Sequence, residues 1–286
     1  MSNPPKALII GRPVKHARSP LIHAFWLEKL GLSGTYERAD VMPGAVNAFL
    51  RELPAKGFAG GNVTVPHKEE AFAACDRVSD AARAVRAVNT FWFEGEALYG
   101  DNTDGLGFVA HLDQVHPGWE SLRPRILILG AGGAARGLTL PLLDRNPASI
   151  AFSNRSAARA EALIADIRKE RPEAPLEIVS WENRSAALSG VDLLINTTSL
   201  GMNGQPPLEI DLSALPAHAI VADIVYVPLE TPLLKTARER GLGILDGLGM
   251  LLHQAVPGFA RWFGMKPVVT PELRARIVAD LLPKPD

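Results

Sequence analysis

The feature that most limits how this chain can fold is a run of six small residues, Gly130-Ala131-Gly132-Gly133-Ala134-Ala135. The run follows four aliphatic residues at 126–129, typical of a buried strand, and precedes a helical pattern that ends near Leu143. Gly130 allows a tight turn, Gly132 lets the backbone approach a pyrophosphate, and Ala135 keeps the helix close to the sheet. The run therefore predicts the strand, turn and helix of a dinucleotide-binding fold, although similar turns also join ordinary strands to helices.

Short β-branched or aliphatic runs alternate with longer helical patterns through the whole chain. Such alternation is typical of βα units and of largely parallel sheets. We therefore predict an α/β fold, with an N-terminal α/β substrate-binding domain and a C-terminal Rossmann-type dinucleotide-binding domain. Strands are expected at 7–10, 35–41, 62–65, 126–129, 149–153, 177–179, 193–196 and 220–224, a hairpin at 89–93 and 96–99, and helices at 19–30, 45–53, 67–74, from 104 on, at 157–169 and at 250–262.

The segment 116–124 contains His116-Pro117-Gly118 and Arg123-Pro124, where proline and glycine interrupt both kinds of pattern. A strand begins directly after it, so we place a domain boundary there. The length of 286 residues also suits two domains. We predict a substrate-binding and catalytic domain at 1–116, a dinucleotide-binding domain at 117–248, and C-terminal helices at 249–286 that pack back on the N-terminal domain.

The charge balance points to small-molecule partners. Lys and Arg total 30 against 31 Asp and Glu, so no net field attracts nucleic acid or an anionic membrane. Cys75 is the only cysteine, which excludes an internal disulfide and a cysteine-built zinc site and suits a reducing compartment. The histidines lack metal-binding spacing, and neither a signal peptide nor a membrane span is indicated. We expect a cytoplasmic protein without a metal, a nucleic-acid partner or a membrane partner.

The residues after the second strand of the dinucleotide-binding unit indicate which dinucleotide it takes. An acidic residue there would bond the ribose 2′-hydroxyl of NAD, whereas arginine accommodates the 2′-phosphate of NADP. Here Asn154, Arg155 and Ser156 follow the strand, and Arg159 lies one turn into the next helix. Guanidinium groups offer a phosphate paired donors, so the sequence favours NADP. Both arginines would also suit a solvated helix face.

A second group of polar residues lies where the strand at 62–65 ends. Asn62 and Thr64 are two apart and so share one face of this strand, and Lys68 follows its end. A lysine whose charge is partly desolvated or balanced can exchange a proton with a substrate hydroxyl during hydride transfer. Its best carboxylate partner is Asp104, in a polar loop before a helix. Taken alone, Asp104 would suit a helix cap and Lys68 a surface position, and spacing does not decide between these interpretations.

Taken in order, these and further motifs resemble the shikimate dehydrogenase family over nearly the whole chain. The resemblance implies reversible NADP-linked oxidation of shikimate to 3-dehydroshikimate, in aromatic amino-acid (chorismate) biosynthesis. It also implies that Lys68 serves the substrate hydroxyl and that Asp104 positions both. The motifs are GRPVKHARSP at 11–20, NVTVPHK at 62–68, AVNT at 87–90, DNTDG at 101–105, GAGGAAR at 130–136, NRSAAR at 154–159 and DGLGM at 246–250.

The same resemblance assigns the binding residues. Ser19, Thr64, Asn89, Tyr226 and Gln254 match positions that hold the substrate. Ile224 and Gly247 match positions near the nicotinamide, and Asp80 matches a position sometimes assigned to the cofactor. The positions that match NADP phosphate and ribose contacts are Gly130, Ala131, Gly132, Gly133, Ala134, Asn154, Arg155, Ser156 and Arg159.

One position departs from the family pattern. The family usually has two serines, one residue apart, whose hydroxyls hold the substrate carboxylate, and here the first is Ala17, so only Ser19 remains. A lost hydrogen bond to a charged group costs about 1.5 to 3 kcal/mol. Lys15 or Arg18 would be able to compensate, or the ligand is an altered cyclohexene acid. A quinate or shikimate dehydrogenase and, in another class, a non-catalytic NADP-binding regulator stay as alternatives, and a homodimer is left open as the assembly.

Overall fold

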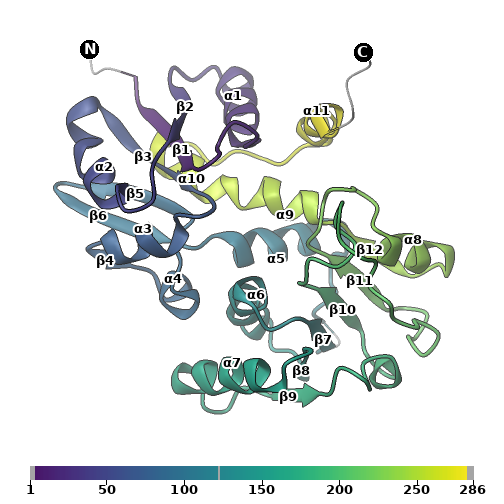
Figure 1. Cartoon of the computed structure of the whole chain (residues 1–286). Helices are drawn as coiled ribbons and strands as arrows, with labels where there is room; N and C mark the ends of the chain where they lie inside the picture. The colour runs from purple at the N-terminus through teal and green to yellow at the C-terminus, as the bar shows by residue number, and fades with distance from the viewer. Residues whose placement is uncertain (1–3, 122, 282–286) are drawn as a thin grey trace. The chain divides into compact units, whose positions relative to one another are not determined.

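The computed structural model describes residues 4–121 and 123–281, and the chain divides into two compact units. Unit 1 comprises Met1–Thr103 and Leu252–Asp286, and unit 2 is Asp104–Leu251. Each unit is built around its own six-stranded sheet, which confirms the predicted α/β class. Figure 1 labels the helices and strands of both units. The boundaries between the units lie at 103/104 and 251/252, whereas the predicted domain boundaries lie at 116/117 and 248/249. The functions assigned to the domains stay a prediction.

The sheet of unit 1 is mixed, with strand order β2-β1-β3-β5-β6-β4. β1 is parallel to β2 and β3, whereas β5 is antiparallel to β3 and β6. The predicted hairpin around Glu94-Gly95 is confirmed as β5 and β6. The strands are β1 Lys6–Gly11, β2 Thr35–Asp40, β3 Phe58–Val63, β4 Arg77–Val78, β5 Thr90–Glu94 and β6 Ala97–Asp101; the helices are α1 Ser19–Leu30, α2 Val46–Glu52, η1 Pro54–Lys56, α3 Lys68–Ala74, α4 Asp80–Val85, α10 Ala255–Phe263 and α11 Pro271–Leu281.

Helix α10 packs closely against the middle of this sheet, although it lies far along the chain. The Trp262 indole donates a hydrogen bond to the Phe91 carbonyl of β5 at 3.0 Å. A Cβ on Gly60 of β3 would lie 2.2 Å from that same carbonyl oxygen. Only glycine therefore fits at position 60, and its absence of a side chain lets the helix and the two strands approach one another.

The sheet of unit 2 has the order β12-β11-β10-β7-β8-β9, and all its neighbouring strands are parallel. This order is that of a doubly wound dinucleotide-binding sheet, whose direction of winding reverses between β7 and β10. Ligands bind such sheets at the carboxyl ends of the strands beside that reversal. The strands are β7 Arg125–Leu129, β8 Ser149–Ser153, β9 Leu176–Val179, β10 Leu193–Asn196, β11 Ile220–Asp223 and β12 Gly243–Leu245; the helices are α5 Asp104–Val115, α6 Gly133–Leu143, α7 Ala157–Glu170, η2 Ala186–Leu188, α8 Pro232–Glu239 and α9 Gly247–His253.

Hydrophobic side chains fill both faces of this second sheet. One core joins α5, α6 and α7 to residues such as Ile128, Phe152 and Ile195, and another joins α8 to residues such as Leu129 and Leu194. Figure 1 shows α8 beside β11 and β12, and α7 beside β9. Because the strands are buried on both faces, their sequences are continuous apolar runs, as parallel strands between helices require.

Three expectations about single elements were wrong. The helix expected at 250–262 is two helices, α9 and α10, that part at Gln254, because Pro257 has no N–H to donate to the carbonyl of His253. β3 ends at Val63 and not at 65, because the Thr64 carbonyl accepts from the His67 N–H at 3.0 Å and so closes a turn. Helix α8 was not expected at all, although Thr231 caps its first turn through the Leu234 N–H.

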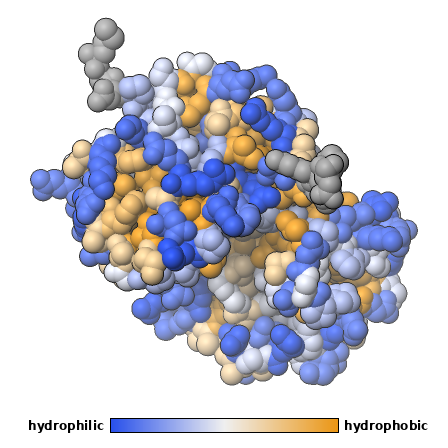
Figure 2. Space-filling model, turned by 45° about the horizontal axis from the view of Figure 1, so that its top comes forward, coloured by the Kyte–Doolittle hydropathy of each residue, from blue (hydrophilic) through white to orange (hydrophobic). Residues whose placement is uncertain are grey.

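Hydrophilic and hydrophobic residues are intermixed over the face drawn in Figure 2. In the two described ranges, none of the helices has the length and apolar character needed to cross a membrane.

Candidate functional site

The predicted substrate residues Asn89 and Gln254 meet in a buried polar cluster of unit 1. The Asn89 side-chain oxygen accepts hydrogen bonds from the Thr103 N–H at 2.9 Å and from the Thr90 hydroxyl at 3.0 Å. Its amide nitrogen lies 3.4 Å from Gln254 Oε1, and the Thr103 hydroxyl donates to the Gln254 carbonyl at 2.8 Å. Gln254 reaches this cluster because the helix breaks at its position. The two residues are thus held in fixed orientations beside the start of β5.

A chain of hydrogen bonds extends this cluster toward Ser19, the first residue of α1. The Asn62 amide donates to the Asn89 carbonyl and to the Thr90 hydroxyl, both at 3.1 Å. Its oxygen accepts in turn from the Tyr36 hydroxyl at 2.5 Å. Burial raises the pKa of the Tyr36 phenol well above its ordinary value, and a hydrogen bond from Ser19 and the charge of nearby Arg38 lower it. Tyr36 therefore links the predicted residues Ser19 and Asn89.

The loop before Ser19 contains Ala17, where the family pattern has a hydroxyl. Arg38 of β2 donates to the Ala17 carbonyl at 2.9 Å. Arg18, a candidate compensating cation, forms an ion pair with Asp280 at 2.9 Å. Lys15, the other candidate, is exposed and makes no ion pair with any residue that the structure describes. Of these two cations, Lys15 is therefore the one whose charge is not paired with a carboxylate of the described residues.

Thr64 directly follows the carboxyl end of β3, and Lys68 begins the next helix, α3. The Thr64 N–H donates to the Ile10 carbonyl at 2.9 Å, so Thr64 still follows β1 although the strand has ended. Lys68 is the first residue of α3, is half-buried, and accepts from the Val88 N–H at 2.9 Å through its carbonyl. This bond ties the Lys68 backbone to the residue beside Asn89.

Asp104 is the first residue of α5 and belongs to unit 2. It is bonded directly to Thr103, which lies in the Asn89 cluster of unit 1. Helix α5 packs very closely on α6, because a Cβ on Gly105 would lie 2.1 Å from the Gly137 carbonyl oxygen. The start of α5 is therefore fixed to the helix that follows the glycine turn.

The glycine turn has the geometry that a dinucleotide pyrophosphate needs. Gly130 has a φ of 108°, which favours glycine, and a Cβ there would lie 2.6 Å from Thr197 Oγ1. A Cβ on Gly132 or Gly133 would meet nothing within 4 Å, so the space beside the start of α6 is open. The N-cap Gly132 provides no side-chain acceptor for the first N–H groups of α6. These donors and the helix dipole fit a phosphate group.

The residues predicted to choose NADP lie beside this turn. The Gly130 N–H donates to the Ser153 carbonyl at 2.8 Å, so the turn contacts the end of β8, after which Asn154 follows. Arg155 and Arg159 are exposed, and the structure records no ion pair for either within 4–121 and 123–281. Two guanidinium groups without carboxylate partners in those ranges, next to the turn, fit a 2′-phosphate.

Ile224 and Gly247, predicted to lie near the nicotinamide, contact one another in unit 2. A Cβ on Gly247 would lie 2.1 Å from the Ile224 carbonyl oxygen, so glycine is required for this contact. Tyr226 follows two residues later and is half-buried. Asp80 belongs to unit 1, where it begins α4, is exposed and approaches Arg83 at 4.0 Å.

Several polar residues of these clusters were not among the predicted site residues. In unit 1 they are Tyr36, Thr90 and Thr103, and in unit 2 they are Asn196, Asp223 and Thr231. A usable signal was present for two of them, since Asn196 and Asp223 end apolar strands where only a bonded polar group is tolerated. Burial raises the pKa of the Cys75 thiol to about 12, so this thiol stays protonated near neutral pH. None of the His, Cys, Asp and Glu side chains that the structure describes group into a set of three fit for a metal.

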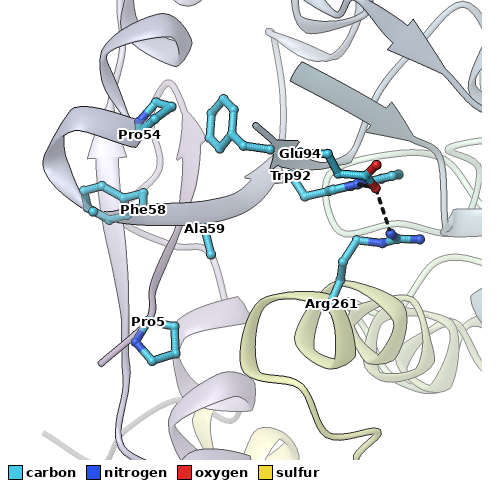
Figure 3. A pocket seen from close by; sticks show the side chains of 9 residues that line it. Pro5, Pro54, Phe58, Ala59, Trp92, Glu94 and Arg261 are labelled. Atoms are coloured by element: carbon cyan, nitrogen blue, oxygen red, sulfur yellow. Dashed lines mark hydrogen bonds and ion pairs between the residues drawn. The ribbon is translucent and has the colours of Figure 1, made fainter. Parts of the chain in front are cut away.

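A separate hollow of about 610 Å³ opens in unit 1, at the amino ends of β1 and β3 (Figure 3). It lies at the opposite end of these strands from Thr64 and Lys68. The charged groups that line it interact with one another. The Arg261 guanidinium carbon lies 3.9 Å from the centre of the Trp92 ring, and Arg261 forms an ion pair with Glu94 at 3.5 Å. The Trp92 indole also donates to Glu94 at 2.9 Å. The hollow is therefore not part of the candidate site.

Comparison with known proteins shows similarity over both units. Residues 9–91 match the family model of the shikimate dehydrogenase substrate binding domain, and residues 247–269 match that of the shikimate 5′-dehydrogenase C-terminal domain. A Methylobacterium radiotolerans protein named shikimate dehydrogenase (NADP(+)) is 55% identical, with 97% of this chain and 98% of that protein covered.

Two solved structures are also similar to this chain. Shikimate 5-dehydrogenase from Thermus thermophilus, in complex with NADP(H) and shikimate, has 33% identity, a TM-score of 0.82, and coverage of 97% of this chain and 100% of its own. Quinate dehydrogenase from Corynebacterium glutamicum, in complex with NAD, has 27% identity, a TM-score of 0.87, and coverage of 97% and 100%.

Proposed function

The chain belongs to the shikimate dehydrogenase family, and from this premise we propose that it is an NADP-dependent oxidoreductase that interconverts shikimate and 3-dehydroshikimate in aromatic amino-acid biosynthesis. The observation that carries the proposal is that one chain contains both halves of such a site. One half is the Asn89 cluster, with the Lys68 carbonyl bonded to the neighbouring Val88 N–H, and the other is the open glycine turn beside Arg155.

We propose that Lys68 carries the proton of the reaction. Bound NADP supplies the hydride acceptor in oxidation, and NADPH supplies the donor in reduction. When shikimate is oxidised, the ring hydroxyl gives its proton to Lys68 Nζ, and the C–O bond becomes a carbonyl as the carbon loses hydride. In reduction, Lys68 returns that proton to the oxygen. Asp104, as the carboxylate partner, orients the lysine and the hydroxyl.

The substrate set in this proposal is Ser19, Thr64, Asn89, Tyr226 and Gln254. Preformed orientation supports the role of Asn89 and Gln254, because neither needs to reorder when a ligand binds. With Ala17 in place of the first serine, Ser19 is the remaining hydroxyl for the substrate carboxylate. We assign these roles to the domain at 1–116 together with the C-terminal helices at 249–286, except that of Tyr226, which lies in the domain at 117–248.

The NADP set in this proposal lies mainly in the domain at 117–248. The backbone of residues 130–134 and the start of α6 would hold the pyrophosphate, and the ribose and 2′-phosphate would bind the segment after β8, through Asn154, Arg155, Ser156 and Arg159. Ile224 and Gly247 would lie near the nicotinamide. Asp80 stays a candidate for a further cofactor contact.

A single assay panel tests the proposal against its rivals. Formation of NADPH or NADH is followed by absorbance with shikimate and with quinate, each with NADP and with NAD. We expect the highest kcat/KM with shikimate and NADP. Higher efficiency with quinate and NAD would replace the proposal by the quinate dehydrogenase alternative, which the departure at Ala17 makes worth testing. No turnover in any combination, with NADPH still bound, would favour a non-catalytic regulator.

We also propose a cytoplasmic location, which the single cysteine supports because it suits a reducing compartment. The assembly proposed is a homodimer. Light scattering during size-exclusion chromatography measures the mass directly, and a mass near that of one 30.7 kDa chain would contradict the dimer.

A further inference from the structure

A buried carboxylate, Asp223, ends β11 in unit 2 and has no role in the chemistry above. It pairs in register with Asn196, which ends the neighbouring strand β10. Asp223 is 1% exposed and Asn196 0%. β10 borders the reversal of winding, where a dinucleotide binds a sheet of this order, and β11 is the next strand. A carboxyl group buried this deeply needs a structural or functional reason.

Three uncharged donors hold the Asp223 side chain. Oδ1 accepts from the Asn196 amide and from the Val225 N–H, both at 3.0 Å, and Oδ2 accepts from the Thr231 hydroxyl at 2.8 Å. Burial raises the pKa of this carboxyl to about 6, while the hydrogen bonds from Thr231, Val225 and Asn196 lower it. An amide at this position has one acceptor oxygen, so only a carboxylate accepts all three donors without competition.

Through these bonds Asp223 fixes the loops that follow two strands. Val225 belongs to the turn directly after β11, and the Ile224 N–H donates to the Asn196 carbonyl at 3.1 Å. The Asn196 side-chain oxygen accepts from the Thr198 N–H at 3.0 Å, which holds the loop after β10. Asp223 is thus the common acceptor for Asn196 at the end of β10 and for Val225 and Thr231 after β11.

The backbone on either side of Asn196 and Asp223 lies against two glycines of the candidate cofactor site, Gly247 and Gly130. The Ile224 carbonyl packs on the Cα of Gly247, where a Cβ would come within 2.1 Å. Thr197, between Asn196 and Thr198, packs on Gly130 of the glycine turn, where a Cβ would come within 2.6 Å of its hydroxyl. Displacement of the Ile224 backbone would therefore change the space beside Gly247, whereas Thr197 is held beside Gly130 by its own bonds to the Leu129 carbonyl, from its N–H at 2.9 Å and its hydroxyl at 2.7 Å.

We infer that Asp223 is a positioning residue, whose carboxylate fixes the Ile224 to Tyr226 backbone so that the nicotinamide end of NADP is received without reordering of that loop. The inference rests on the proposed function, because the roles of Ile224 and Gly247 come from it. Asp223 touches neither substrate nor cofactor in this account. It acts through Val225 and Asn196, and the adenosine end of the cofactor, bound after β8, does not depend on it.

The test compares two ligands that share only the adenosine end. Dissociation constants are measured for NADPH, by nicotinamide fluorescence, and for adenosine 2′,5′-bisphosphate, by calorimetry. The variants are Asp223→Asn and the milder Thr231→Val, which removes one donor. The matched control is Thr236→Val on the same helix, whose hydroxyl bonds only to the Pro232 carbonyl at 3.0 Å among the bonds recorded for it.

We expect Asp223→Asn to weaken NADPH about tenfold or more, and Thr231→Val less, with the bisphosphate constant and the control unchanged. Wild-type NADPH affinity in both variants, or equal weakening of both ligands, would overturn the inference. If Asp223→Asn does not fold, Thr231→Val decides alone by the same criterion. No substrate enters this test, so a wild-type protein that binds NADPH but does not turn over shikimate would refute the proposed function and leave this comparison valid.

Discussion

Mild acid is expected to destabilise unit 1 through His23, a histidine in the core of that unit. The side chain is 0% exposed, and its ring is stacked 4.0 Å from Tyr36 and 5.8 Å from Phe259. Neither ring nitrogen makes a hydrogen bond of normal geometry to any residue that the structure describes. Burial lowers the pKa of His23 to about 3 from 6.5, although the nearby Asn62 side chain raises it. The folded protein therefore holds this imidazole neutral.

The sign and size of the effect follow from these two pKa values. Between pH 6.5 and pH 3 the unfolded chain binds a proton at His23 that the folded chain does not, so the free energy of unfolding falls as the pH falls. Above pH 6.5 the contribution is negligible. Each pH unit below that value costs about 1.4 kcal/mol, so the loss at about pH 5 is about 2 kcal/mol.

Urea unfolding at about pH 7.5 and about pH 5, followed by tryptophan fluorescence, measures this loss. The variant His23→Phe keeps an aromatic ring in the stack but has no titrating group. All other acid-sensitive groups are common to both proteins, so the difference between their pH dependences isolates His23. His16→Gln, at an exposed histidine, is the control and is expected to follow the wild type. An equal loss of stability in wild type and His23→Phe would show that His23 is protonated, or paired, in the folded state.

Three further predictions concern activity. Ala17→Ser restores a hydroxyl beside Ser19 and is expected to lower the KM for shikimate about tenfold with little change in kcat; an unchanged KM would show that the first serine is dispensable here. Lys68→Ala is expected to abolish turnover while the NADPH dissociation constant stays near that of the wild type, and substantial residual activity would exclude Lys68 as the proton carrier. Arg155→Gln is expected to raise the KM for NADP about tenfold or more and to leave the KM for NAD unchanged, whereas an equal effect on both cofactors would contradict a 2′-phosphate contact.

The architecture of unit 2 was predictable because its signals are local. The strands expected at 149–153 and 193–196 are confirmed without change as β8 and β10. Both are short apolar runs, buried on both faces, and no amphipathic helix of ordinary length has such a pattern. The glycine turn likewise depends only on neighbours in sequence, since a positive φ at Gly130 and an open helix start are properties of a few consecutive residues. Local rules therefore recovered five of the six strands of this sheet and its turn, but not β12.

The break at Gln254 could not be predicted from periodicity. Residues 250–262 keep an apolar face across the break, because Leu252 and Phe259 are both fully buried. Periodicity alone therefore predicts one continuous helix. The proline at 257 contained the contrary information, but its consequence depends on where the helix begins, and a proline in the first turn is tolerated whereas one further in is not.

The hydrogen-bonded clusters were the least predictable part, and the reason is their distance along the sequence. Asn62 was recognised as a polar residue near the end of a strand, but its partners Tyr36 and Asn89 are 26 and 27 positions away. Single-sequence patterns have periods of about two or about 3.6 residues and contain no information at such separations. What the sequence does contain is the cost: a buried amide or carboxylate without partners would destabilise the fold by about 1 to 3 kcal/mol. A polar residue at the end of an otherwise apolar strand therefore predicts a hydrogen-bond partner far away in the sequence. Asn62, Asn196 and Asp223 each have such a partner.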